Sequence, residues 1–191
     1  MTMTRPMWGE VFEMPPGTSA DDLVRLPDDG YKYELYDGEL VREMTFAGHG
    51  ELCQRLGGEL YLYARTSGFH NRIVQNTLFE LTLPGAASRT VLAPDIAVLR
   101  GTTPAAWDTV ERAAPLLAIE VVSESQTLAE LALKAQQYRT AGVDQVWVVD
   151  HKTRSVQVWT AQGTTTLADT QPLTSPLLPG FSVDVRYLLD G

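Results

Sequence analysis

Two stretches of the chain carry apolar residues at helical spacing. The first covers residues 49–65, where the pattern stops at Ser67-Gly68, a typical helix end. The second covers residues 127–140 and opens with Thr127-Leu128-Ala129-Glu130, a capping box in which the acid bonds back to the first amides. The spacing therefore predicts two main helices, and the capping signal at Ser19-Ala20-Asp21-Asp22 predicts one short helix before them.

Several other runs have the pattern of strands. Residues 31–43 alternate between apolar and polar and turn at Asp37-Gly38, which predicts a hairpin. Residues 72–83 and 90–99 each predict a strand, and residues 116–122 and 145–149 predict strands buried on both faces. Residues 155–160 and 164–167 predict a final hairpin, and the tail from 176 to 191 predicts an extended segment with a last turn.

The order of these elements predicts an α/β fold. The helix between the strands at 116–122 and 145–149 is a crossover, which makes that pair parallel, whereas short connections make the earlier pairs antiparallel. We therefore expect a mixed β-sheet flanked by helices on both faces. We assign residues 28–191 to a single domain and residues 1–27 to an N-terminal arm with the short helix.

Two acids interrupt the apolar runs. Glu120 lies within Leu116-Leu117-Ala118-Ile119-Glu120-Val121-Val122, and Asp95 lies in the middle of the run at 91–99. An unpaired carboxylate in such a place costs several kcal/mol, so something must compensate it. Two acids on adjacent apolar strands predict one shared metal site, and Mg²⁺ needs only one or two protein carboxylates. Such a site is sufficient for phosphodiester cleavage, with Lys134 orienting or deprotonating the water or stabilising the phosphate.

Composition changes this picture in three ways. The formal net charge of −9 argues against binding nucleic acid by bulk charge, so a nucleic-acid partner needs a local basic path or bound cations. With neither a membrane-length apolar stretch nor a signal peptide in the sequence, we expect a cytoplasmic protein. The single cysteine, Cys53, has no cysteine neighbour with which to build a zinc site, so we expect a small core residue.

A set of short motifs recurs along the chain in an order that resembles a known family. The set consists of Tyr33-Glu34-Leu35, Asp37-Gly38-Glu39-Leu40, His49, Pro94-Asp95-Ile96, Glu120-Val121-Val122-Ser123, Lys134, Tyr138, Ala141-Gly142-Val143, Trp147-Val148-Val149-Asp150 and Thr174-Ser175-Pro176-Leu177-Leu178-Pro179-Gly180. In this order the motifs resemble the Uma-type family, inferred to be bacterial restriction endonucleases, within the PD-(D/E)XK nuclease superfamily. The likeness covers residues 28–189, nearly the whole chain.

The resemblance implies a Mg²⁺- or Mn²⁺-dependent endonuclease that acts on DNA. Asp95 and Glu120 match the metal-binding acids, the carbonyl of Val121 would be a third ligand, and Glu34 matches a further acid near the metal. The superfamily lysine stands two residues after the second acid, where this chain has a valine. In this branch Lys134, on the following helix, takes that role.

The chain also departs from the family pattern at two acids. Glu124 stands where the family usually has proline, and Glu130 stands where it usually has aspartate. Glu124 adds negative charge beside a site that must admit phosphate.

Each candidate residue also has a purely structural interpretation. Asp95 could be a strand-end carboxylate bonded to backbone amides, and Lys134 a solvated residue paired with Glu130. Glu34 could be an exposed hairpin acid, and His49, which would otherwise serve as a catalytic base, a helix-start or core residue. Tyr138 and Trp147 are most simply core aromatics.

Three functional hypotheses follow from these interpretations. The first is the nuclease, which we expect to be a homodimer because double-strand cleavage is simplest with two related active sites. The second is a nuclease-like binding or interaction protein that no longer cuts DNA. The third is a structural dimer built through the apolar tail segment Leu177-Leu178-Pro179-Gly180-Phe181.

Overall fold

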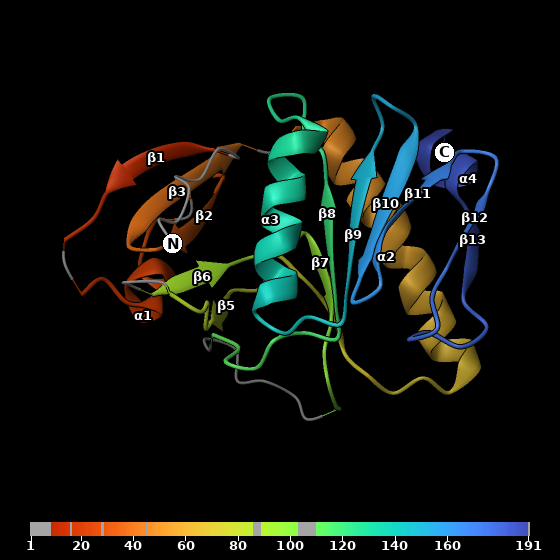
Figure 1. Ribbon diagram of the computed structural model, residues 1–191, viewed down its shortest axis with the longest axis horizontal. Coiled ribbons are helices and arrows are strands. Elements are labelled where there is room, and N and C mark those ends of the chain that lie inside the picture. The colour runs from red at the N-terminus through yellow and green to blue at the C-terminus, as the bar shows by residue number, and fades with distance from the viewer. Residues whose placement is uncertain are drawn as a thin grey trace.

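The largest element of this computed structural model is a six-stranded mixed sheet (Figure 1). The structure describes residues 9–15, 17–27, 29–44, 46–85, 89–102 and 110–190. The strand order is β11-β10-β9-β8-β7-β4. The strands are β4 (Ile73–Gln75), β7 (Ile96–Val98), β8 (Leu117–Val121), β9 (Gln145–Asp150), β10 (Ser155–Thr160) and β11 (Gly163–Ala168).

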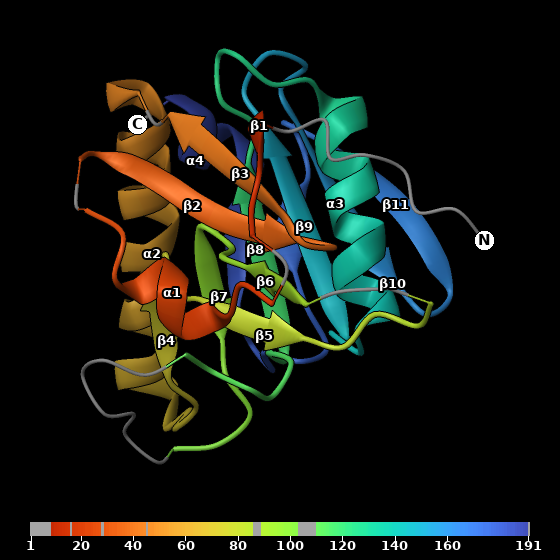
Figure 2. The same ribbon diagram turned by 90° about the vertical axis from the view of Figure 1, so that its left-hand side faces the viewer.

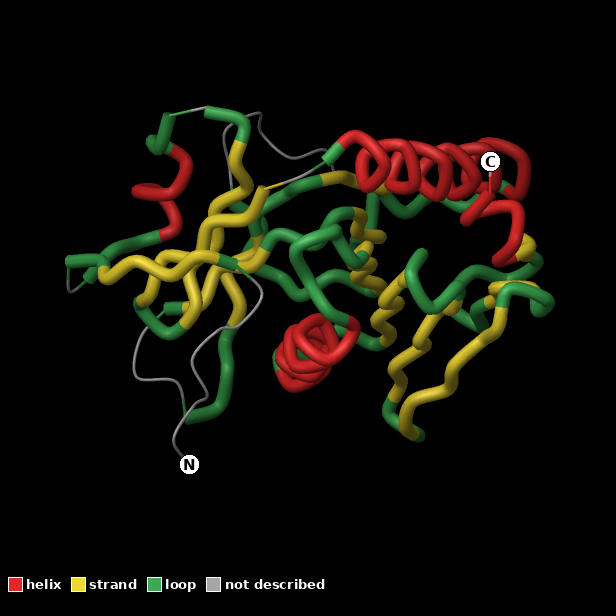
Figure 3. The backbone as a smooth tube through the Cα atoms, turned by 90° about the horizontal axis from the view of Figure 1, so that it is seen from above, coloured by secondary structure: helices red, strands yellow, loops and turns green. Residues whose placement is uncertain are grey.

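Two helices cover opposite faces of this sheet, as the sequence predicted. α2 (Ala47–Ser67) lies on one face and α3 (Leu128–Thr140) on the other, which is plainest from above (Figure 3). Strand β8 runs parallel to β9 through the α3 crossover, whereas β7 pairs antiparallel with β8. Successive β8 residues alternate between the two apolar layers, since Ile119 packs with the α2 face and Ala118 with the α3 face.

A second sheet is built around the predicted hairpin. Its order is β1-β3-β2-β6-β5, with β1 (Glu10–Glu13), β2 (Tyr31–Tyr36), β3 (Glu39–Met44), β5 (Phe79–Leu81) and β6 (Thr90–Leu92). The turn is confirmed at Asp37 and Gly38, which both have positive φ (47° and 86°). The short helix α1 (Ala20–Val24) buries Ala20 and Leu23 in an apolar cluster with strands β2, β3 and β6. The sequence did not predict β1, which pairs with β3, and the domain boundary at residue 27 stays a prediction.

The predicted strands at 72–83 and 90–99 are wrong as single strands. Each run is divided between the two sheets, because β4 and β7 join the large sheet whereas β5 and β6 join the second. Asn76, with a φ of 47°, interrupts the first run, and Ala93-Pro94-Asp95 interrupts the second. A proline cannot donate to a strand ladder, which favours a break at this point. Asp95 therefore stands just before β7, not in the middle of a strand.

The C-terminal tail packs against the protein's own core. β12 (Pro172–Thr174) pairs with β13 (Ser182–Asp184), and α4 (Val185–Asp190) follows beside α2 (Figure 1). Leu178 and Phe181 are buried, and the Phe181 ring stacks on Trp147 with centroids 6.0 Å apart. Leu178 and Phe181 thus fill an intramolecular core and are not available to a partner, and the hypothesis of a dimer built through this tail stays a prediction. None of the described helices has the length and apolarity needed to span a membrane.

Leu56 tests the packing of α2 on the large sheet. Its side chain is fully buried, so Leu56→Ala should lower the free energy of unfolding by about 2–5 kcal/mol through lost transfer energy and a cavity. Leu62→Ala is the matched control on the same helix, because Leu62 is 52% exposed and should change stability by no more than about 0.5 kcal/mol. Urea denaturation measures both variants, and equal losses would contradict this packing.

Candidate active site

The predicted site residues meet where the two sheets adjoin. Figure 2 shows the β2–β3 hairpin crossing in front of β7 and β8. The sheet register pairs Ile96 with Ile119, which brings Asp95, before β7, beside Glu120 on β8. The hairpin contributes Glu34, α2 contributes His49, and α3 contributes Lys134. The structure thus brings together Asp95, Glu120, Lys134, Glu34 and His49, the side chains that the sequence predicted.

One buried ammonium group, that of Lys32, lies between the two predicted metal-binding acids. Its Nζ is 2.9 Å from Asp95 Oδ1 and 3.7 Å from Glu120 Oε2. The same Nζ is 3.6 Å from Glu43 Oε2. Asp95 and Glu120 therefore point at one position that holds a positive charge.

Lys134 is the second buried ammonium of the site. Its Nζ lies 2.9 Å from Glu34 Oε1, 3.0 Å from Glu120 Oε1 and 3.3 Å from Glu43 Oε1. The interpretation of Lys134 as a solvated partner of Glu130 is wrong, because Lys134 is fully buried. Glu130 instead caps α3, as predicted, and accepts a hydrogen bond of 2.7 Å from the Thr127 backbone N–H.

Backbone amides hold two of the acids in place. Asp95 Oδ2 accepts a hydrogen bond of 2.8 Å from the Val121 N–H, and Glu34 Oε1 accepts one of 2.7 Å from the Ala93 N–H. Glu34 is fully buried, so its interpretation as an exposed hairpin acid is wrong. The contact of Val121 with Asp95 is made through its N–H, and the role of its carbonyl as a metal ligand stays a prediction.

The aromatic and imidazole groups of the site also contact the acids. The Tyr138 hydroxyl donates to Glu120 Oε1 at 2.8 Å, so this residue is more than a core aromatic. His49 Nε2 lies 3.1 Å from Asp95 Oδ2. Burial alone would lower the pKa of His49, but the hydrogen bond and charge of Asp95 outweigh it and raise that pKa.

The cluster contains more negative than positive charge. Four buried carboxyl groups (Glu34, Glu43, Asp95 and Glu120) face two ammonium groups (Lys32 and Lys134), which gives a formal charge of −2 when every carboxyl group is ionised and His49 is neutral. Buried charge is costly unless it is fully paired. Either a bound cation or a proton on Glu120, whose pKa burial raises, would reduce this excess of negative charge.

Burial and pairing shift the protonation of these groups in opposite directions. Burial raises the pKa of Glu120 to about 7, although Lys134 and Lys32 oppose this shift. Burial would also raise the pKa of Asp95, but Lys32 and His49 hold it below its usual range. Burial would lower the pKa of Lys134, yet Glu120, Glu34 and Glu43 raise it. The three acids therefore favour the ammonium form of Lys134.

The sequence analysis missed two members of the cluster, Lys32 and Glu43. The signal for both was present in the hairpin, because a turn at Asp37-Gly38 fixes the strand register. That register places Lys32 directly opposite Glu43, and period-two alternation puts Lys32 on the same face as Glu34. Alternation and turn type together were thus sufficient to find this charged face.

Several cavities reach the edge of the cluster, and one of about 370 Å³ is lined by Lys32, Tyr33 and Ala93 among others. One of about 360 Å³ is lined by Glu43, Arg42 and Gln126 among others, and one of about 290 Å³ is lined by His49, Arg55 and Glu124 among others. Asp95 and Glu120 themselves are only 4% and 2% exposed. Glu124 points its carboxylate to His151 Nε2 at 2.9 Å, away from the buried cluster.

Comparisons with known proteins agree with this fold. Residues 20–186 match the family model Uma2, described as "Putative restriction endonuclease". A crystal structure from Anabaena variabilis ATCC 29413, described as "a putative nuclease belonging to DUF820", superposes with a TM-score of 0.73. The match covers 88% of this chain and 96% of that chain at 16% sequence identity, so it shows the shared restriction-endonuclease-like fold. No curated protein matches this chain significantly.

Tyr138→Phe tests how far the hydroxyl supports the buried acid. Hydrogen bonds to charged groups contribute about 1.5–3 kcal/mol, so we expect a loss of that size in the free energy of unfolding. Tyr61→Phe, at a side chain 63% exposed, is the matched control and should leave stability unchanged. Urea denaturation without added metal measures both variants. If the unfolding midpoint of Tyr138→Phe equals that of the wild type, the hydrogen bond from Tyr138 to Glu120 does not stabilise the folded protein.

Proposed function

This chain belongs to the Uma2 family, and we propose that it is a metal-dependent endonuclease that hydrolyses phosphodiester bonds in DNA. One observation carries the proposal: the carboxylates of Asp95 and Glu120 both contact a single cationic group, the ammonium of Lys32. Asp95, just before β7, and Glu120, on β8, thus share one cation-binding position. That is the arrangement the chemistry requires.

The donor set fits a hard divalent cation. Asp95 and Glu120, with the carbonyl of Val121 as a proposed third ligand, would offer oxygen atoms alone, which Mg²⁺ and Mn²⁺ prefer. The formal charge of −2 in the cluster equals the charge that such an ion would neutralise. When bound, the ion would polarise the phosphate and lower the pKa of a bound water.

The chain's own residues have separate roles in this proposal. Lys134 is held as an ammonium group by Glu34 and Glu120, so it stabilises negative charge on the reacting phosphate instead of accepting a proton. Glu34 positions Lys134 through their 2.9 Å contact. His49 orients Asp95 through its 3.1 Å contact with Oδ2.

Substrate would approach through the cavity of about 360 Å³ beside Glu43. Arg42 lines this cavity, and its guanidinium lies 4.3 Å from the centroid of the Tyr31 ring, which also lines it. A cation and an aromatic ring together suit a nucleotide, whose phosphate is anionic and whose base stacks. Arg42 also pairs with Glu10 in the lining of this cavity, so a chain with a net charge of −9 would need bound cations as well as this guanidinium to hold DNA.

A second candidate function is a nuclease-fold binding protein that does not cut. The position of Lys32 favours it, because its ammonium already lies between the acids that would hold the metal. In that case Lys32 takes the place of an external ion between Asp95 and Glu120. Metal binding separates the two candidates, since only the nuclease requires it.

The proposed nuclease acts as a homodimer with one active site in each subunit, because each strand of a duplex then has its own site. Light scattering on the intact protein measures this directly. The cytoplasmic location stays a prediction from the sequence.

Asp95→Asn tests the proposed activity directly. The substitution keeps the volume of the side chain but removes the charge, so Mg²⁺-dependent nicking of plasmid DNA should fall at least about 100-fold. Asp21→Asn, at an exposed position on α1, is the matched control and should cleave at the wild-type rate. Circular dichroism establishes that both variants are folded, and undiminished cleavage by folded Asp95→Asn would dispose of the proposal.

Lys32→Gln tests whether the internal ammonium competes with metal. Two unit charges 4 Å apart interact by roughly 4 kcal/mol at an effective dielectric constant near 20, so removing the competitor should tighten Mn²⁺ binding about tenfold or more. Isothermal titration calorimetry measures the affinity without any cleavage assay. Lys152→Gln is the control, because Lys152 Nζ binds the carbonyls of Ser123, Glu124 and Gln126.

The two candidate functions predict different titrations. Saturable binding of Mn²⁺ by the wild type, with a higher affinity in Lys32→Gln, supports the metal-dependent nuclease. Absence of saturable heat in both folded proteins leaves the non-cutting candidate.

A further inference from the structure

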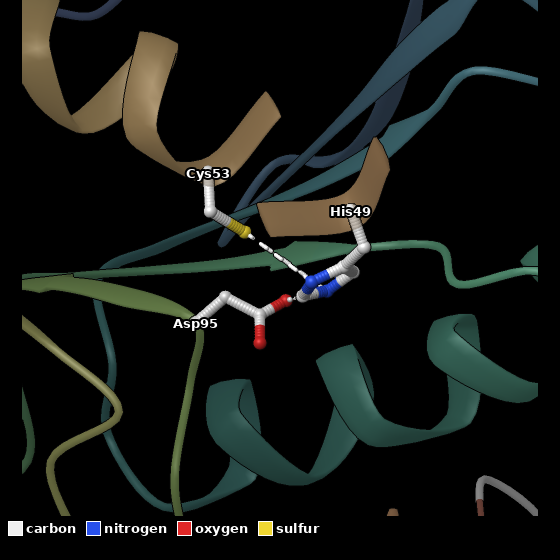
Figure 4. A group of neighbouring side chains, drawn as sticks. All are labelled: His49, Cys53 and Asp95. Atoms are coloured by element: carbon white, nitrogen blue, oxygen red, sulfur yellow. Dashed lines mark hydrogen bonds and ion pairs between the residues drawn. The ribbon is translucent and has the colours of Figure 1, made fainter. Parts of the chain in front are cut away.

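Three groups of a different chemical kind meet on the α2 side of Asp95. His49 and Cys53 stand four residues apart on α2, so their side chains share one helix face and meet Asp95 from the sheet (Figure 4). His49 Nε2 lies 3.1 Å from Asp95 Oδ2 and 3.9 Å from Cys53 Sγ. One ligand atom from each residue lies within 4.8 Å of the others.

These separations are close to those of a tetrahedral metal site. Metal–ligand bonds of about 2.0–2.3 Å at tetrahedral angles place nitrogen, oxygen and sulfur ligands roughly 3.4–3.6 Å apart. The separations of 3.1 Å and 3.9 Å lie on either side of that range. Small side-chain rotations are therefore sufficient to place one ion in contact with all three residues.

The ligand types select the class of metal. A thiolate and an imidazole favour borderline ions such as Zn²⁺ and Co²⁺, whereas Mg²⁺ takes oxygen ligands. We propose that His49, Cys53 and Asp95 form a second metal site, specific for borderline divalent ions, and that an ion bound there inhibits the proposed nuclease. Binding requires a Cys53 thiolate and a neutral His49 with its proton on Nδ1, so the Cys53 proton, together with the second proton of His49 when the imidazole is charged, leaves to solvent.

Neighbouring groups support such a site. The Val121 N–H donates to Asp95 Oδ2, the oxygen that faces His49, and hydrogen bonds of this kind fix the orientation of ligating carboxylates. Lys32 contacts the other oxygen, Oδ1, so it does not block the proposed position. The cavity of about 290 Å³ is lined by His49, so it reaches one of the three proposed ligands.

The inhibition rests on the proposed function, whereas the binding does not. Asp95 would use Oδ2 for the borderline ion and Oδ1, now beside Lys32, for Mg²⁺. Two divalent cations would then share the single negative charge of one carboxylate and repel each other. Occupation of the second site should therefore weaken the binding of Mg²⁺ at the first.

Titration with Co²⁺ tests the binding, because a cobalt–thiolate bond gives a near-ultraviolet charge-transfer band. The chain contains a single cysteine, so any such band comes from Cys53. We expect a saturable band with the wild-type protein under a non-thiol reductant, and no band with Cys53→Ala. Absence of the band in folded wild-type protein at millimolar Co²⁺ would overturn the proposed site.

Two histidine variants test whether the His49 imidazole binds the metal. Removing a residue that only orients a metal ligand lowers metal affinity roughly 10- to 100-fold. His49 is proposed as a ligand itself, so His49→Ala should lower the affinity for Co²⁺ at least as much. His70→Ala, at an exposed position, is the matched control and should bind as the wild type does. Equal Co²⁺ affinity in both variants would remove His49 from the site and overturn the proposal.

Cleavage assays with Zn²⁺ test the inhibition separately. Micromolar Zn²⁺ should slow Mg²⁺-dependent cleavage by the wild type at least about tenfold, and Cys53→Ala should resist this inhibition. Equal inhibition of both proteins would overturn the regulatory part. A cobalt band in a protein that never cleaves DNA would leave the metal site supported and refute the proposed function instead.

Discussion

The structure depends on the burial of a charged cluster at the junction of its two sheets. Four carboxylates and two ammonium groups are removed from water there, and the sheets adjoin only if those charges are paired. Lys32 and Lys134 each contact three carboxylates, so the hairpin, the strands that carry Asp95 and Glu120, and α3 are tied by the same contacts. Removing one partner would leave a buried charge uncompensated, which is far more costly than losing a surface ion pair.

Such a cluster is an inefficient way to stabilise a protein, and that points to function. Well-packed apolar residues of similar volume usually stabilise a core as well as a buried ion pair does, or better. This chain instead keeps Asp95 and Glu120 at one point, holds Asp95 with a backbone amide, and leaves two negative charges in excess. Asp95 faces a lysine with Oδ1 and a histidine–cysteine pair with Oδ2, so one carboxylate connects the two proposed metal sites.

Local sequence signals predicted the helices and strands well where the spacing of apolar residues and the turn or cap residues indicated the same element. The two main helices, the hairpin at Asp37-Gly38 and the parallel crossover between β8 and β9 were all predicted and are confirmed. The runs at 72–83 and 90–99 were not predicted correctly, because a continuous apolar run has no local mark of a change from one sheet to another. The charged face of the hairpin was predicted only at Glu34, although the register also placed Lys32 opposite Glu43.

The sequence by itself determined that Asp95 and Glu120 would need compensation, since a carboxylate in an apolar strand cannot remain unpaired. It also determined the helical faces, the turn and the capping of α3, which depend on residues close together in the chain. Only the tertiary structure decided which charges meet: Lys134 turned inward to three acids, Lys32 came between the predicted metal ligands, and Cys53 gained His49 and Asp95 as neighbours. Those contacts join residues up to 100 positions apart, Lys134 and Glu34, and their geometry depends on how two sheets pack, which no local pattern encodes.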